Sequence, residues 1–354
     1  MGFIVHLTDL HLGAGGAAIA VDDRKVNVID DGERTSRRDE AETAIKKLMK
    51  AFKAAGTSIS ALVISGDVTV TCSSEGFADL QTFLGDAFGD LLPEASKIVA
   101  LPGNHDVQWF ASTAAERYRS FNDYCVKAGF VTPPLEGLTL PEDMRGWNSS
   151  DQHALVNEEE HWAIVPINSA EFSGVRSVLL DDKKRELPDE SGLDAIEAIL
   201  RSDALHSAIF KQLRKSREYD MARVSKKQIT AFDRTVERVE KRLTGASKPL
   251  LLAALHHHLS PVDEREEIKP FESLSNLGRV RLMLQEREVS MIFHGHKHKS
   301  RFFWDSREDA SADGRSRNRH DMLVLAVARL EGLGLQRTPS PMSSILRRDP
   351  MATT

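Results

Sequence analysis

Short apolar runs that end abruptly in polar residues recur along this chain. Five share the pattern: "FIVHLTDLH" (3–11), "ALVISGD" (61–67), "KIVALPGNHD" (97–106), "LLLAALHHH" (250–258) and "SMIFHGHKH" (290–298). Continuous aliphatic and β-branched residues are typical of strands buried on both faces, and the polar residues mark where each strand ends. A sixth run, "HWAIVPINS" (161–169), predicts another core strand.

Segments with the periodicity of helices lie between these predicted strands. Ala44, Leu48 and Phe52 recur at four-residue spacing within 38–55, and Gly56 ends that pattern. Further helices are predicted over 76–88, 113–129 and 225–243, the last opened by the capping box Ser225-x-x-Gln228. The alternation of strands and helices predicts an α/β fold.

The middle and the end of the chain have a different character. Residues 180–245 are dense in charge and contain no strand signal of similar strength. We therefore predict a core made of 1–169 and 224–335, and a helical insertion over 170–223 that forms a cap or a partner surface. The tail over 336–354 is predicted to be flexible.

Composition narrows the class of protein. The 354 residues carry a net charge of −6, so there is no general electrostatic attraction for nucleic acid or anionic membranes. The two cysteines, Cys72 and Cys125, are too few for a disulfide framework or a thiolate zinc site. No apolar run approaches the roughly 20 residues of a membrane helix. We expect a cytoplasmic protein.

The polar strand ends supply one consistent set of possible metal ligands. In an open α/β sheet, functional groups collect beyond the carboxyl ends of the strands. The candidates there are Asp9, His11, Asp67, Asn104, His105, His256, His296 and His298. Carboxylates, an amide and imidazoles suit Mn, Fe, Co or Zn, and more than four ligands indicate more than one ion. Two such ions can clamp both the attacking and the leaving oxygen at phosphorus.

Glycines stand directly before three of these clusters. Gly66, Gly103 and Gly295 each precede a candidate ligand, where a missing side chain lets the backbone turn sharply and approach other groups closely. The chemistry of the residues does not decide which histidine of the run 256–258 is the ligand.

In order along the chain, "DLH" (9–11), "GD" (66–67), "GNHD" (103–106), the histidine after the apolar strand (256) and "GHKH" (295–298) resemble the five signatures of the calcineurin-like metallophosphoesterases. The resemblance is strongest to the bacterial class III cyclic-nucleotide phosphodiesterases, and it spans roughly 3–170 and 224–304. It implies a four-layer αββα sandwich of two mixed β-sheets flanked by helices. The family has several more strands after "GHKH", whereas only 301–305 and 321–330 look like strands here.

The resemblance also implies a role for each motif residue. One divalent metal ion would be bound by Asp9, His11 and His298, the other by Asn104, His256 and His296, with Asp67 bridging the two. His256 is chosen because the family's ligand comes first after the strand. His105 would contact the phosphate and stabilise or protonate the leaving oxygen, and Asp106 would orient His105. Hydrolysis would proceed by attack of a metal-bound hydroxide on phosphorus. His6 and His294 are expected outside the coordination sphere.

Three substrate classes stay open at this point. A cyclic nucleotide or other small phosphodiester is favoured by the motif details. A DNA or RNA nuclease of the repair-exonuclease type is the first alternative, although those enzymes usually have an acidic residue where Val70 stands. The second is a phosphomonoesterase or protein phosphatase that acts in a complex, through 170–223 or with a second copy. Substrate contacts are predicted for Arg34, Arg37, Arg38 and His257, and no membrane contact is expected.

Overall fold

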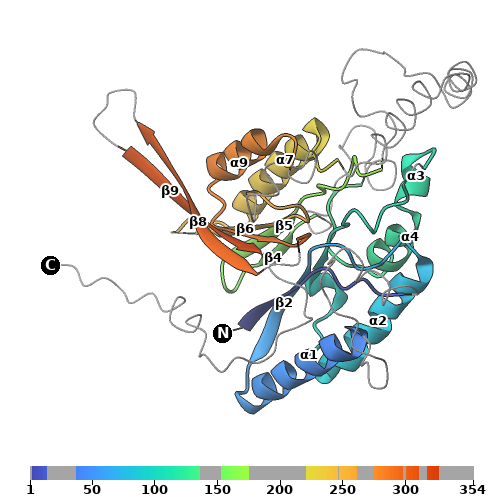
Figure 1. The fold of residues 1–354 in the computed structure, drawn as a ribbon. Helices are drawn as coiled ribbons and strands as arrows, with labels where there is room; N and C mark the ends of the chain where they lie inside the picture. The colour runs from blue at the N-terminus through green and yellow to red at the C-terminus, as the bar shows by residue number, and fades with distance from the viewer. Residues whose placement is uncertain are drawn as a thin grey trace, which may run out of the picture.

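The computed structural model describes residues 2–13, 37–109, 111–135, 153–174, 221–245, 247–260, 274–297, 300–310 and 317–326 (Figure 1). Its strands are β1 (Gly2–Leu7), β2 (Ser58–Ile64), β3 (Ile98–Ala100), β4 (Leu155–Asn157), β5 (Trp162–Pro166), β6 (Leu250–Ala254), β7 (Met291–His294), β8 (Arg301–Ala310) and β9 (Arg317–Ala326). Its helices are α1 (Arg37–Ala54), α2 (Ser74–Phe88), α3 (Ala114–Arg117), α4 (Arg119–Phe121), α7 (Lys226–Arg242) and α9 (Leu277–Glu286).

Two sheets form the centre of the described fold. The first has the order β1-β2-β3, and its strands are all parallel. The second has the order β4-β5-β6-β7-β9-β8 and is mixed, because β4 and β8 run antiparallel to their neighbours. The β8–β9 hairpin extends this second sheet, with β9 pairing in parallel with β7. Both late strands predicted from the sequence are thus confirmed, with β9 described as far as Ala326, and they pair at one edge of the sheet in the described part of the chain.

Successive side chains in a strand point to opposite faces of its sheet, and in both sheets one face packs on helices and the other on the opposing sheet. In β2, Leu62 and Ile64 pack toward α1 and α2, whereas Ala61 and Val63 face the second sheet. In β6 the residues alternate in the same way between α7 and α9 on one side and the first sheet on the other. Figure 1 shows the two helix pairs on opposite outer sides of the sheets. The predicted four-layer αββα sandwich is confirmed.

Tertiary contacts change one of the predicted helices. The expected helix over 113–129 is divided into α3, α4 and a π-helical turn, Asn122–Val126. At the first break Tyr118 leaves helical geometry, and its buried hydroxyl accepts a hydrogen bond from the Asn168 side chain at 2.8 Å. Propensity alone predicted one helix, but this long-range contact favours the break.

The N-terminus of α7 has half of the expected capping box. The Ser225 hydroxyl accepts the Gln228 backbone N–H at 3.1 Å, as predicted. The Gln228 side chain does not return to Ser225, because its amide donates instead to the carbonyl of Pro134. None of the helices in the described ranges is long and apolar enough to cross a lipid bilayer.

The predicted insertion leaves and rejoins the core at adjacent points. Ala170 pairs with Arg223 in an isolated parallel bridge, and the Arg223 N–H donates to the Ser169 carbonyl at 3.1 Å. Residues 175–220 and the tail over 336–354 lie outside the described residues. The domain boundaries and the role of 170–223 as a cap or partner surface therefore stay predictions.

His153 makes the stability of the fold sensitive to acid. Burial lowers the pKa of His153 from 6.5 to about 4, and its Nδ1 is 2.7 Å from the Thr132 carbonyl. The unfolded chain takes up the proton first, so stability present above pH 6.5 is lost as the pH falls toward about 4. Between pH 7 and 5, the wild type is expected to lose about 2 kcal/mol more unfolding free energy than His153→Asn. Urea denaturation at both pH values measures this difference, and equal losses would contradict it.

Candidate metal centre

The loops that carry the candidate ligands meet beyond the strand ends and are bonded to one another. The Asp9 N–H donates to the Gly66 carbonyl and the His11 N–H to the Asp67 carbonyl, both at 3.0 Å. Asp9, His11, Asp67 and His296 all have positive φ, between 46° and 77°. Such a backbone is uncommon for residues with a side chain and persists only where surrounding structure holds it, typically at functional sites.

Three glycines allow this close approach, as their positions in the sequence indicated. A Cβ on Gly103 would lie 2.1 Å from Asp67 Oδ1, and one on Gly66 would lie 2.6 Å from His256 Nδ1. A Cβ on Gly295 would lie 2.5 Å from Asp9 Oδ2. Each distance is shorter than any real contact, so the three loops can pack around the ligands only with glycine at these positions.

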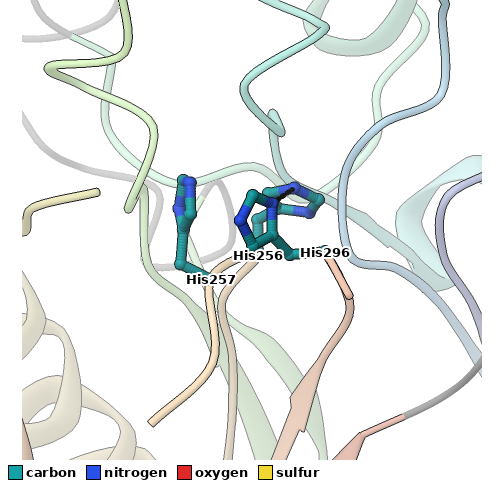
Figure 2. A group of neighbouring side chains, drawn as sticks. All are labelled: His256, His257 and His296. Atoms are coloured by element: carbon teal, nitrogen blue, oxygen red, sulfur yellow. Dashed lines mark hydrogen bonds between the residues drawn. The ribbon is translucent and has the colours of Figure 1, made fainter. Parts of the chain in front are cut away.

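One part of the centre is built around the His256 ring. Its Nδ1–H donates to the Ser65 carbonyl at 2.8 Å, which leaves Nε2 to face the other candidates. His256 Nε2 lies 3.0 Å from Asn104 Oδ1, 3.2 Å from His296 Nδ1 and 3.3 Å from Asp67 Oδ2. The rings of His256, His257 and His296 lie together at the strand ends (Figure 2). His256 and His257 are thus both in a candidate group, and His256 Nε2 is the atom that lies near Asn104, Asp67 and His296. The choice of His256 as the ligand stays a prediction.

Asp9 and His11 stand beside Asp67. The buried Asp9 carboxylate accepts the Thr8 hydroxyl at 2.8 Å and the His296 N–H at 3.0 Å. Three groups of side chains have atoms close enough to hold a metal ion: Asp9, Asp67 and His256; His11, Asp67 and His105; and His256, His257 and His296. Asp67 and His256 are each shared by two of these groups, and of the two only Asp67 has a carboxylate, with two oxygens that could bind two ions. His298 lies outside the described residues, so its ligand role stays a prediction.

The spacing of these atoms suits first-row divalent ions. Two donors about 2.1 Å from one ion, at angles of 90–110°, are roughly 3.0–3.4 Å apart. The distances from His256 Nε2 to its neighbours, 3.0 to 3.3 Å, fall in that range. The donor set of carboxylate, amide and imidazole matches the same class of ion.

The electrostatics of the centre favour a bound cation. Burial would lower the pKa of His256, but Asp67 and then Asp9 raise it to about 10. Burial would raise the pKa of Asp67, yet the nearby His256, His105 and His11 hold it well below its ordinary value. Buried carboxylates need compensating positive charge, which metal ions would supply.

His105 and Asp106 differ in part from the expectation. The His105 ring is oriented by the Val70 carbonyl, 2.6 Å from Nδ1, and not by Asp106. Asp106 is fully buried, and its carboxylate accepts the backbone N–H groups of Val68, Thr69 and Gly103 at 2.9 to 3.1 Å. Because these donors belong to the loops after β2 and β3, Asp106 joins the two loops that carry Asp67 and Asn104.

His257 is fixed by a serine that sequence reasoning missed. The Ser169 hydroxyl oxygen accepts the backbone N–H groups of His256 and His257 at 3.2 and 3.1 Å. Its hydrogen is then donated to His257 Nδ1, 2.9 Å away. The His257 ring is fully buried, so its predicted contact with substrate is not favoured by this geometry and stays a prediction. The only early signal for Ser169 was its position at the end of a core strand.

The remaining predicted residues lie apart from these groups. Arg38 pairs with Asp86 at 3.3 Å and Asp79 at 3.8 Å on α2, in the outer helical layer. Arg34 and the side chain of Arg37 lie outside the described residues. His6 and His294 are in none of the three groups, as expected; burial lowers the pKa of His6 to about 3 and that of His294 to about 4.

Comparison with the profiles of protein families agrees with this geometry. The profile of one family, described as calcineurin-like phosphoesterase, matches residues 4–300. A comparison with curated protein sequences found no match. Among solved structures, the chain is similar to a purple acid phosphatase from yellow lupin (Lupinus luteus) seeds, with 12% identity and a TM-score of 0.41. The match covers 92% of this chain and 43% of that phosphatase.

Proposed function

Since the chain belongs to the calcineurin-like phosphoesterase family, we propose that it hydrolyses a small phosphodiester, such as a cyclic nucleotide, at a two-metal centre. The observation that carries this proposal is the position of Asp67, which is shared by two groups of candidate ligands. The ions would be Mn, Fe, Zn or Co, because the donors are of the kinds that these metals prefer. Two bound ions would lower the pKa of a water molecule and neutralise charge that develops at phosphorus.

The residues around the ions would position the reaction. The donor atoms that would hold the ions belong to Asp9, His11, Asp67, Asn104, His256 and His296. His298 stays a predicted ligand. His105 is partly exposed beside them. Burial lowers the pKa of His105, but Asp67 and the hydrogen bond to Val70 outweigh it and raise the pKa above 6.5. A protonated His105 is suited to donate a proton to the leaving oxygen.

The net negative charge of the chain favours a small substrate over a nucleic acid duplex. Binding of double-stranded nucleic acid draws on many contacts between basic side chains and phosphates, and the chain has a net charge of −6. Val70, where repair nucleases have an acidic residue, is buried and holds His105 through its carbonyl. We therefore place a nuclease second to a small-molecule phosphodiesterase.

A substrate panel tests the proposal. With Mn²⁺ added to metal-free protein, bis(p-nitrophenyl) phosphate is expected to be cleaved at least about 10-fold more efficiently than p-nitrophenyl phosphate, and a chelator should abolish both activities. A cyclic nucleotide and linear DNA complete the panel. Faster cleavage of the monoester would point to a phosphomonoesterase, and degradation of DNA with cyclic nucleotides untouched would point to a nuclease. Metal-loaded protein that cleaves no phosphoester would refute the proposal.

A further inference from the structure

One peptide group links two residues of the centre and is held at both ends. It joins Asn104, a candidate ligand, to His105, the candidate acid. Its N–H donates to Asp67 Oδ1 at 2.9 Å, and its carbonyl oxygen accepts the indole N–H of Trp109 at 2.8 Å. The plane of this peptide sets the direction in which both side chains leave the backbone, so Trp109 controls one end of that plane.

The Trp109 ring is confined by a second loop. Gly174 has φ +66°, and a Cβ on it would lie 2.3 Å from Trp109 Cγ and 2.5 Å from Cδ2. The backbone before Gly174 is held in turn by the buried Arg117 guanidinium, which donates to the carbonyls of Ala170 and Ser173. The indole is therefore wedged between the loop that contains Asn104 and a braced segment that follows β5.

We propose that Trp109 is a positioning residue for the metal centre: it holds the Asn104–His105 peptide, and Gly174 holds Trp109. This inference rests on the proposed function in taking Asn104 as a metal ligand. Groups that orient ligands without touching the metal typically contribute 10- to 100-fold to metal affinity. Loss of the indole hydrogen bond should thus weaken binding of the ion at Asn104 more than that of the other ion.

The first test removes the hydrogen bond and keeps an aromatic ring. Metal-free Trp109→Phe is titrated with Mn²⁺ by calorimetry, beside wild type and the matched control Trp162→Phe. Trp162 also donates its indole N–H to a side chain, Glu160 Oε2 at 3.0 Å, but it lies in β5 between the two sheets. For Trp109→Phe, one of two Mn²⁺ ions is expected to bind about 10-fold more weakly than in wild type, whereas Trp162→Phe keeps both wild-type affinities.

The second test keeps the indole and displaces it. Gly174→Ala places a methyl group against the Trp109 ring. Gly56→Ala is its matched control, because Gly56 has nearly the same φ, +64°, with no atom within 4 Å of an added Cβ. Both variants carry the backbone strain of a left-handed alanine, and the contact with Trp109 is present only in Gly174→Ala. Gly174→Ala is expected to weaken the binding of one Mn²⁺ ion, as Trp109→Phe does.

The outcomes separate the inference from the proposed function. A merely structural role for Trp109 would lower the thermal unfolding temperature of Trp109→Phe and leave its Mn²⁺ affinities equal to those of Trp162→Phe. That result, or equal affinities for Gly174→Ala and Gly56→Ala, would overturn the inference and leave the proposed function intact. A wild-type chain that binds none of Mn²⁺, Fe²⁺, Zn²⁺ and Co²⁺ would overturn both.

Discussion

Asp67→Asn is expected to lower kcat/KM for bis(p-nitrophenyl) phosphate on the order of 1000-fold. Asparagine keeps the shape of the side chain and its contact with the His105 N–H, but it removes the negative charge. That carboxylate lies 3.3 Å from His256 Nε2 and is shared by two groups of candidate ligands. Without it, two cations cannot be held close together, so the metal content should fall below two ions. Steady-state kinetics and elemental analysis measure the two effects.

Asp305→Asn is the matched control for this variant. Asp305 is also a buried aspartate in a charged pair, bonded to Arg281, but it lies in β8 outside the three candidate groups. Its loss should lower stability and leave kcat/KM within about twofold of wild type. Asp67→Asn with two bound ions and near-normal turnover would rule out a bridging role for Asp67.

His105→Ala is expected to lower kcat by at least about 100-fold while both metal ions stay bound. The Val70 carbonyl engages Nδ1 of the ring, so Nε2 is the nitrogen that would donate a proton to the leaving oxygen. Titration with Mn²⁺ and single-turnover kinetics of the loaded variant separate binding from the chemical step.

His161→Ala controls for loss of an imidazole that is bonded to a carbonyl. The His161 ring lies 2.9 Å from the Ser247 carbonyl on an exposed turn, so this change should leave kcat unaltered. His105 also stands in a group with His11 and Asp67 that is close enough to hold an ion. Loss of one bound ion in His105→Ala would therefore make His105 a ligand and contradict its role as the acid.

Elements with strong local patterns were predictable. The apolar runs identified β1, β2, β3, β5, β6 and β7, because strands that are largely buried between layers are mainly apolar. Helices α1, α2 and α7 showed a 3.6-residue period and clear ends. In α1, however, the predicted face was wrong: Ala41, Ile45 and Met49 are buried, whereas Leu48 is 41% exposed. By contrast, α9 was missed although Val280, Met283 and Leu284 form a buried stripe, because this stripe is short and lies among charged residues. The strand β4, with three residues, is too short for any periodic signal.

The sequence by itself determined which residue types stand at the ends of the core strands, in which order, and where glycine precedes them. These are local properties of the chain, and they were enough to indicate a two-metal phosphoesterase. Only the tertiary structure decided which atoms face one another. It set the His256 ring against the Ser65 carbonyl, placed the Val70 carbonyl and not Asp106 at the His105 ring, and brought Trp109 against Gly174. Each of these contacts joins residues from separate parts of the chain. Two are made to a backbone carbonyl and one depends on a glycine far along the chain, so the local sequence around each residue does not indicate its partner.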